Sequence, residues 1–234
     1  MNRKNVLKWG VCSLLLFCLF FVTNPMEAKA ATKAKYYYKT YDKSKTYTSG
    51  KVTIKDSEKY KRVILKGNSV AVKKINKKLK ALCDSELKSM PAGNAETDVK
   101  YRYSDDTYLN EYTSKVTYND KGVISIIISY EWYQGGVYNH GVNGYTFSLK
   151  TGKQLKLTDV CKGNNQTLTK QIRSGLKSKY KNADFYENAL SKLSANKCNF
   201  YLKKGNKAVV FFQQYDLSYG AAGTFDVTLK SKYK

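Results

Sequence analysis

The sequence predicts an α+β fold in which helices pack on one face of antiparallel sheet, as one unit or as two intimately packed subdomains. Strand-like alternation and helical periodicity occupy separate stretches of the chain, which favours α+β over a doubly wound sheet. The strand-like stretches are joined by short turn signals typical of an antiparallel meander. Hydrophobic residues make up 42% of the 234 residues, which is enough to build a packed core.

The first thirty residues, 1–30, are typical of a cleaved signal peptide. Arg3, Lys4 and Lys8 precede an apolar run of twelve residues, 11–22, and Ala28–Ala30 has the small-x-small pattern of a cleavage site. A membrane-spanning helix needs about 20 apolar residues, so an uncleaved anchor is the alternative. We therefore expect a secreted, extracytoplasmic chain that associates with the cell wall and has no membrane span after cleavage.

A basic leader and an N-terminal subdomain are expected next. Residues 31–46 interleave lysine and tyrosine without a helical or strand period, which predicts a flexible leader. The subdomain, residues 47–133, starts with strand-like runs from Tyr47 to Leu65. Asn68–Ser69 then caps an amphipathic helix whose apolar stripe is suited to packing on a sheet, and Met90–Pro91 ends it.

Three strands complete the predicted meander. Tyr108–Tyr118 and Val123–Tyr133 are separated by the turn sequence Asn119–Gly122. We expect the glycine-rich stretch Gly135–Gly144 to be a long loop that leads to a strand over Tyr145–Leu149.

The remaining residues, 134–234, form the expected C-terminal subdomain. Leu168, Ile172 and Leu176 recur at helical spacing. The other expected elements are a short helix opening at Asp184, a hairpin over Asn199–Leu202 and Ala208–Phe212, and a last strand over Thr224–Leu229.

The net charge narrows the choice of partners. Removing residues 1–30 leaves 38 of the 42 Lys+Arg and 17 of the 18 Asp+Glu residues, a net charge of +21. Nucleic acid is the usual partner of so basic a chain, but an exported protein rarely meets it, so we expect no nucleic acid. The predicted ligand is an anionic wall polymer or an envelope protein. The alternative is that the lysines serve only solubility.

The residue types nominate no cofactor, metal site or catalytic site. One histidine, His140, cannot complete a site that needs two, and Cys83, Cys161 and Cys198 lie outside any C-x-x-C pair. These cysteines are interpreted as small buried hydrophobic residues, with one disulfide as the alternative. No phosphate-binding loop or dinucleotide fingerprint is present. We therefore expect a binding module and not an enzyme.

A small wall hydrolase is the alternative from another class. Glycoside hydrolysis uses two carboxylates at a fixed separation. Glu131 is the first candidate, with Asp159 or Asp216 as the second acid. The sequence alone leaves open whether these acids meet.

The predicted recognition surface consists of two loops, Gly135–Tyr145 and Tyr215–Gly223. Glycine lets a backbone approach a ligand closely, and tyrosine offers a wide apolar face with a polar tip. The alternative is that both are ordinary connections whose tyrosines cover the core. The predicted ligand-facing residues are Tyr138, His140, Tyr215 and Tyr219.

The second half of the chain also carries a series of short motifs in a fixed order. They are Gly135–Gly136, His140–Gly141, Leu149–Lys153, Leu155–Asp159 and Gln214–Gly223. This series resembles the extracytoplasmic domain of RsiV-type anti-sigma factors, which is shared with the non-catalytic amino-terminal part of the peptidoglycan deacetylase PdaC. The resemblance extends to Tyr47 to about Tyr130, which is similar to the preceding domain of both.

The resemblance implies a secreted, non-catalytic cell-envelope binding module. Because the RsiV domain binds lysozyme, lysozyme is a candidate partner by resemblance. Only eight residues precede Trp9 and the apolar run, and no histidines remain for a deacetylase domain. We therefore expect the scaffold of these families without the anti-sigma or deacetylase activity.

Overall fold

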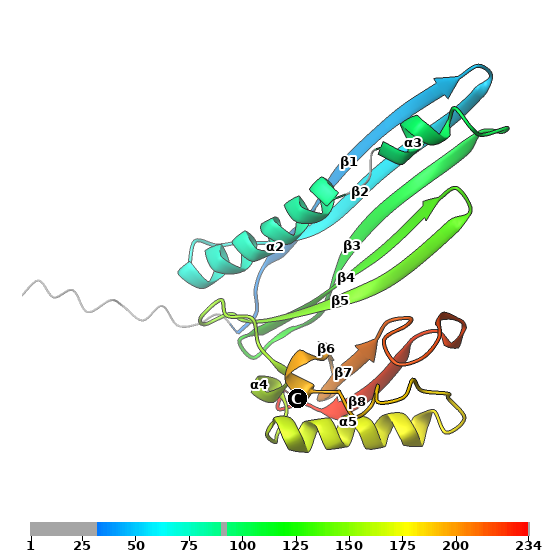
Figure 1. Ribbon diagram of the computed structural model, residues 1–234. Coiled ribbons are helices and arrows are strands. Elements are labelled where there is room, and N and C mark those ends of the chain that lie inside the picture. The colour runs from blue at the N-terminus through cyan, green and yellow to red at the C-terminus, as the bar shows by residue number, and fades with distance from the viewer. Residues whose placement is uncertain (1–31, 90–92, 234) are drawn as a thin grey trace, which may run out of the picture. The chain divides into compact units, whose positions relative to one another are not determined.

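Two β-sheets form the framework of the residues that the computed structural model describes, 32–89 and 93–233 (Figure 1). The larger sheet has the order β1-β2-β3-β4-β5 and the smaller one has the order β6-β7-β8. The strands are β1 (Tyr36–Ser49), β2 (Val52–Leu65), β3 (Asp106–Asp120), β4 (Val123–Gln134), β5 (Val137–Ser148), β6 (Asn199–Lys203), β7 (Lys207–Phe212) and β8 (Phe225–Lys230). Helices pack against these sheets, so the predicted α+β class is confirmed.

The first strand corrects the expectation of a flexible leader over residues 31–46. Every residue of β1 has a partner in β2, from Tyr36 opposite Leu65 to Ser49 opposite Val52. β1 is an edge strand, and most of its side chains are exposed on both faces. It therefore has no alternation of apolar and polar residues, the signal by which a half-buried strand is identified in a sequence.

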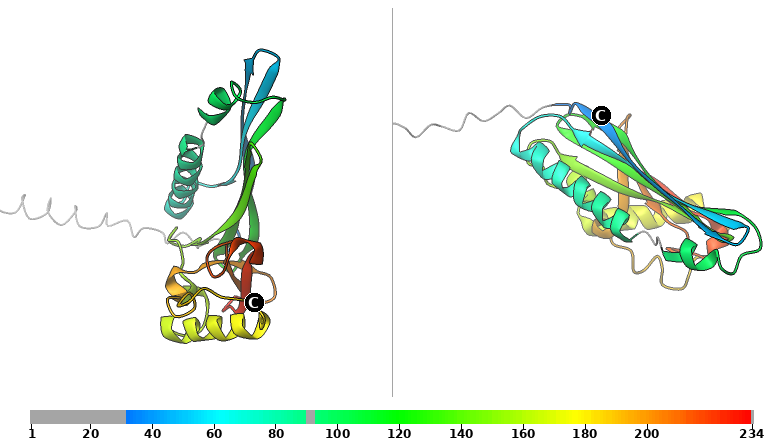
Figure 2. Two further views of the ribbon diagram at one scale, coloured as in Figure 1. Left: turned by 45° about the vertical axis from the view of Figure 1, so that its right-hand side comes forward. Right: turned by 90° about the horizontal axis from the view of Figure 1, so that it is seen from above.

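The larger sheet is not wholly antiparallel, which corrects a second expectation. β2 and β3 run parallel, from Ile54 opposite Asp106 to Lys61 opposite Thr113, whereas the other neighbours are antiparallel. A parallel pair needs a crossover connection, usually a helix. Here α2 (Val70–Ser89) and α3 (Gly93–Asp98) provide it, and both lie on the same face of the sheet (Figure 2).

Helix α2 confirms the amphipathic helix predicted after Asn68–Ser69. Its start is capped by Ser69, whose Oγ accepts a hydrogen bond from the backbone N–H of Val72 at 3.2 Å. The stripe formed by Ile75, Leu79 and Cys83 is buried against the sheet. The predicted end at Met90–Pro91 lies outside the described residues.

The smaller sheet is covered by α5 (Asn165–Lys179), which confirms the second predicted helix. Leu168, Ile172 and Leu176 are buried in a core that includes residues of all three strands of this sheet. The other short elements are α4 (Leu157–Val160) and the 3₁₀ turns η1 (Ala195–Lys197) and η2 (Gly220–Ala222).

The helix expected to open at Asp184 is absent: residues 187–192 form turns, and residues 184–186 and 193–194 are irregular. Asn188 has a positive φ of 62°, which a continuous right-handed helix does not allow. The backbone N–H of Tyr186 donates instead to the carbonyl oxygen of Leu217 at 2.8 Å. The segment therefore combines this tertiary hydrogen bond with local turn bonds, such as that from the Lys192 N–H to the Asn188 carbonyl oxygen at 3.0 Å, and forms no continuous helix.

The glycine-rich stretch expected as a long loop, Gly135–Gly144, is a turn followed by β5. Gly135 and Gly136 have positive φ values of 60° and 94° and form a two-residue hairpin connection. From Val137 onward, every residue of β5 has a partner in β4. The loop prediction was wrong because glycine inside a strand, as at Gly141, gives the same signal as glycine in a loop.

Three remaining expectations concern the subdomain boundary, the signal peptide and a membrane span. The boundary expected after residue 133 lies inside β4, which pairs with β5 in one sheet. Residues Ala31–Lys234 form one compact unit. The predicted signal peptide lies outside the described residues. Among residues 32–89 and 93–233, no helix has the length and apolar character needed to cross a membrane.

Candidate functional site

The smaller sheet contacts the larger one at the outer edge of β5. The backbone N–H of Gly144 donates to Asn199 Oδ1 at 2.9 Å, and Asn199 Nδ2 donates to the carbonyl oxygen of Val142 at 3.4 Å. The Gln213 side chain accepts from the Val142 N–H at 3.2 Å and also donates to the Val142 carbonyl. Side-chain amides therefore satisfy backbone groups that another strand would otherwise pair with.

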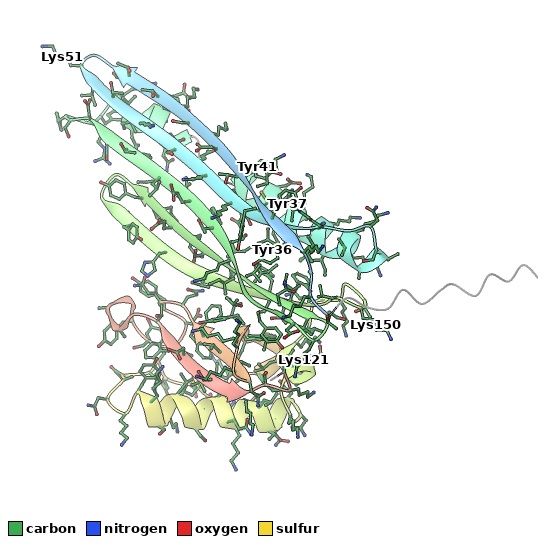
Figure 3. All side chains as sticks on the ribbon, turned by 180° about the vertical axis from the view of Figure 1, so that it is seen from behind. Tyr36, Tyr37, Tyr41, Lys51, Lys121 and Lys150 are labelled. Carbon is green, nitrogen blue, oxygen red and sulfur yellow. The ribbon has the colours of Figure 1, made fainter. Side chains whose placement is uncertain are left out.

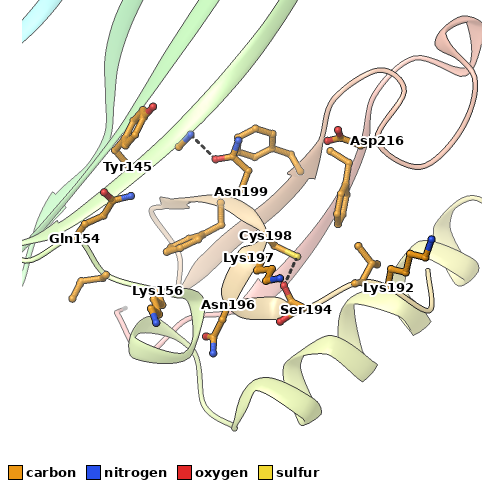
Figure 4. Close-up of a pocket in the computed structure, with 16 residues that line it drawn as sticks. Tyr145, Gln154, Lys156, Lys192, Ser194, Asn196, Lys197, Cys198, Asn199 and Asp216 are labelled. Carbon is orange, nitrogen blue, oxygen red and sulfur yellow. Dashed lines mark hydrogen bonds between the residues drawn. The ribbon is translucent and has the colours of Figure 1, made fainter. Parts of the chain in front are cut away.

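A pocket of about 670 Å³ lies beside this contact (Figure 4). It is lined by three segments that are far apart in the sequence. The first segment is β5 with the chain that follows it, and it contributes Gly144, Tyr145, Gln154, Leu155 and Lys156. The second leads into β6 and contributes residues 192–194 and 196–200. The third is the end of β7 with the turn after it, and it contributes Phe211, Phe212 and Asp216. The pocket therefore depends on the packing of the two sheets.

Positive charge dominates the pocket lining. Lys156, Lys192 and Lys197 are all exposed, and Asp216 is the only acid among the lining residues. The Asp216 carboxylate accepts a hydrogen bond from the backbone N–H of Gln213 at 2.7 Å. With one carboxylate against three ammonium groups, the pocket favours an anionic ligand.

Hydrogen bonds fix the backbone at Lys156 and around Lys192. Lys156 precedes α4; its N–H donates to the Asp159 carboxylate at 2.8 Å, and its carbonyl oxygen accepts from the Asp159 N–H at 3.0 Å. The Arg173 guanidinium donates to the carbonyl oxygens of the two residues that flank Lys192, Ser191 at 2.6 Å and Leu193 at 3.2 Å. The backbone on both sides of the pocket is therefore fixed by hydrogen bonds.

The rest of the lining combines aromatic rings with side-chain amides. The rings belong to Tyr145, Phe200, Phe211 and Phe212. The amides belong to Gln154, Asn196 and Asn199 (Figure 4). An amide can both donate to and accept from a hydroxyl group, and aromatic faces pack on apolar surfaces such as the faces of sugar rings. The lining is therefore suited to a ligand that carries both hydroxyl groups and negative charge.

All three described cysteines are free thiols, of which Cys83 and Cys161 are buried and Cys198 lines the pocket. The Cys198 thiol donates to the carbonyl oxygen of Ser194 at 3.3 Å. Burial, and to a smaller extent the nearby Asp216 carboxylate, raises the pKa of this thiol from 9.0 to about 11. A cysteine with such a pKa is a poor nucleophile at neutral pH.

We predict that Cys198 reacts slowly with iodoacetamide at pH 8 and faster as the pH approaches 11. A thiol whose pKa is about 11 instead of 9.0 holds roughly a hundredfold less thiolate at pH 8. The folded state keeps this proton more tightly than the unfolded chain does. The contribution of the protonated Cys198 thiol to the free energy of unfolding is therefore present below pH 9 and lost as the pH rises towards 11.

Mass spectrometry of the Cys198 peptide after timed alkylation, with the urea-unfolded chain as control, measures this dependence. A reaction rate that levels off near pH 9 in the folded protein would contradict the raised pKa.

Two of the residues predicted to face a ligand lie on β5. Tyr138 is 55% exposed, and its ring centroid lies 5.6 Å from that of His140, which is also exposed. The Tyr138 hydroxyl donates to Glu131 at 2.9 Å. Both side chains are accessible, but they lie on a strand and not on the expected loop.

The other two predicted residues lie after β7. Tyr215 is 68% exposed and has a positive φ of 69°, and its ring lies where a side chain on Gly220 would be. Tyr219 is 51% exposed and lines a second depression beside Lys179 and Phe225.

Gln213, two residues before the second predicted segment, is hydrogen-bonded to Val142 of the first. The side chains of Tyr138, His140, Tyr215 and Tyr219 are not in the lining of the pocket. Their role in recognition stays a prediction. The pocket lysines were missed because Lys156 and the pair Lys192 and Lys197 come from two segments that no spacing rule connects.

The carboxylates considered for hydrolysis each have a separate structural partner. Glu131 accepts from Tyr138, Asp159 caps α4, and Asp216 accepts from the backbone of Gln213. Of the three, only Asp216 lines the pocket. In the described parts of the chain, no three His, Cys, Asp or Glu side chains are grouped in a way that could hold a metal ion.

Comparisons with known proteins relate the fold to other chains. The sequence matches no family model and no curated protein. The structure is similar to a DUF3298 family member from Bacteroides fragilis, with a TM-score of 0.57 and 17% identity over 86% of this chain and 92% of that one. A DUF3298 family protein from Pseudomonas aeruginosa gives a TM-score of 0.54 and 12% identity over 86% and 93%.

These similarities show a fold shared with an uncharacterised domain family. The finer resemblance to RsiV-type proteins and PdaC stays a prediction from the sequence motifs.

Proposed function

We propose that this chain is a secreted, non-catalytic module that binds an anionic polymer of the cell envelope. The observation that carries the proposal is the pocket at the contact between the two sheets. It presents Lys156, Lys192 and Lys197 together, beside aromatic rings and amides that suit a hydroxyl-bearing ligand. Asp216, the one acid of the lining, already accepts a backbone hydrogen bond.

A wall polymer is favoured over an envelope protein by charge. The chain from residue 31 onward has a net charge of +21, so it would concentrate on surfaces rich in phosphate or carboxylate. Many lysozymes are themselves strongly basic, and two basic proteins repel each other at long range, which slows their association. Lysozyme binding, which the RsiV resemblance implies, is therefore the second candidate, and the experiment below distinguishes it from polymer binding.

We predict that the triple variant K156Q/K192Q/K197Q binds purified wall sacculi about 3- to 150-fold more weakly, since each exposed ion pair contributes roughly 0.2–1 kcal/mol and three are lost. Binding of the unmodified chain should also fall as salt rises, because charges are screened over about 8 Å at 0.15 M ionic strength. Sedimentation with sacculi, with and without their teichoic acid, measures both effects.

The matched control is the variant K162Q/K170Q/K177Q, which loses the same charge from exposed positions outside the pocket lining. Equal weakening by the control would show that only net charge matters. Binding that survives removal of teichoic acid and high salt would overturn the polymer proposal, and tight binding to lysozyme instead would favour a protein partner.

A further inference from the structure

The β1–β2 hairpin concentrates positive charge away from the pocket. Between residues 35 and 66 the sequence contains nine lysines and one arginine against three acids. All the lysines except the half-buried Lys61 are exposed. Figure 3 shows Lys51 at the tip of the hairpin. The nine are Lys35, Lys39, Lys43, Lys45, Lys51, Lys55, Lys59, Lys61 and Lys66.

Burial removes two of the three acids from the surface of this hairpin. Asp56 and Glu58 are only 4% and 3% exposed, and Glu58 pairs with Lys43 at 3.5 Å. Asp42 is therefore the only exposed acid of the hairpin. The surface that a ligand meets is more basic than the sequence count indicates.

Tyrosine rings hold several of these lysines along the strands. The Nζ atoms lie over ring centroids at 5.0 Å for Lys39 on Tyr41, 4.4 Å for Lys45 on Tyr47, 4.7 Å for Lys61 on Tyr38 and 5.7 Å for Lys66 on Tyr37. A lysine placed over a ring has already lost part of its side-chain freedom, so less entropy is lost when an anion binds.

The geometry of β1 suits a linear ligand. At about 3.3 Å per residue, fourteen strand residues extend over roughly 40 Å. Lys39, Lys43 and Lys45 are separated by even numbers of residues, so their side chains lie on one face of the strand. A small anion could contact one of them at a time, whereas a polymer with regularly spaced charges could contact several together.

The free edge of β1 also argues against a protein strand as the occupant. β2 is the only strand that pairs with β1 among the described residues. Exposed lysines on an edge strand disfavour the addition of another strand. Lysine is a point charge suited to phosphate, and a phosphate polymer needs no strand-like backbone to bind.

We propose that the β1–β2 hairpin is a second binding surface, which lies along a linear phosphate-bearing polymer of the envelope. This inference rests on the proposed function, but it uses none of the residues that line the pocket. The pocket would bind a local segment of the polymer or its end, and the hairpin would add affinity that grows with polymer length.

The test uses the variant K39Q/K45Q/K51Q, whose lysines are exposed; Lys43 is kept because it pairs with Glu58. The probes are inorganic polyphosphate of several tens of units and tripolyphosphate, titrated from low to moderate salt. We expect about a tenfold or greater loss of affinity for the long polymer and at most a twofold change for tripolyphosphate. The slope of log K against log salt should fall by about two to three, since each lost phosphate contact removes roughly 0.7–0.9.

The control K162Q/K170Q/K177Q should keep a markedly higher affinity for the long polymer. An unchanged salt slope in the hairpin variant, or an equal loss in the control, would overturn the inference. Binding of poly-L-glutamate as tight as that of polyphosphate would overturn the assignment to phosphate. A hairpin variant that loses the long polymer while K156Q/K192Q/K197Q still binds sacculi normally would support the hairpin and contradict the pocket, so the two proposals fail separately.

Discussion

Replacing Gly144 by valine is expected to lower the free energy of unfolding by about 3 kcal/mol, the upper end of what overpacking usually costs. A Cβ atom at this position would lie 2.1 Å from the carbonyl oxygen of Phe200 and 2.7 Å from its carbonyl carbon. Both are backbone atoms and cannot rotate away. β5 and β6 would have to separate, and the hydrogen bond from the Gly144 N–H to Asn199 would be lost with them.

Urea unfolding measures the effect, with Gly144→Ala as the informative second variant. Because the clash comes from the first side-chain atom, alanine should cost nearly as much as valine. Lys115→Val is the matched control at an exposed strand position, where substitutions usually change stability by less than about 0.5 kcal/mol. An unchanged unfolding midpoint in Gly144→Ala would show that the two sheets do not meet at this point.

The elements that the sequence predicts well are those in which the buried positions are also the apolar ones. In α5, Leu168, Ile172 and Leu176 face the core and the remaining surface is polar. The hairpin of β6 and β7 has apolar runs on either side of the Lys204–Asn206 turn sequence. In α5 the helical period identifies the element, and in β7 a continuous apolar run next to a turn signal does so.

The elements that the sequence does not predict are those whose conformation depends on contacts with residues far away in the chain. β1 is an edge strand with little burial on either face, so its lysines and tyrosines give no period. β5 contains glycines for reasons of space: a side chain on Gly141 would meet the Tyr130 ring, and one on Gly144 would meet the backbone of Phe200. Neither neighbour can be identified from the local sequence.

The residues of the candidate site also differ in whether local sequence or distant contacts determine their placement. Exposure of Tyr138 and Tyr219 could be expected from their glycine-rich surroundings, and both are about half exposed. The grouping of Lys156, Lys192 and Lys197 depends on how the two sheets pack. Surface lysines are numerous in this chain, so no local signal separates these three from the others.

Phe147→Ala is the second substitution with a large expected effect, a loss of about 3–5 kcal/mol of stability. Phe147 is 1% exposed and packs in a cluster with Ile75 and Leu79 of α2. It also forms a bridge to Gln154, and the adjacent Thr146 carbonyl accepts from the Leu155 N–H at 2.7 Å. The same part of β5 therefore supports the core beneath α2 and the segment that lines the pocket.

Urea unfolding of Phe147→Ala, Leu79→Ala and the double variant measures whether α2 and β5 act together. Residues in contact usually show a coupling free energy of about 0.5–3 kcal/mol, whereas distant sites add within roughly 0.3–0.5 kcal/mol. Phe147→Leu is the control, because it keeps most of the volume and should cost under about 1.5 kcal/mol. Strict additivity of the two alanine variants would mean that α2 does not pack on Phe147. Coupling would show that the helix crossing the sheet stabilises the strand from which the pocket is built.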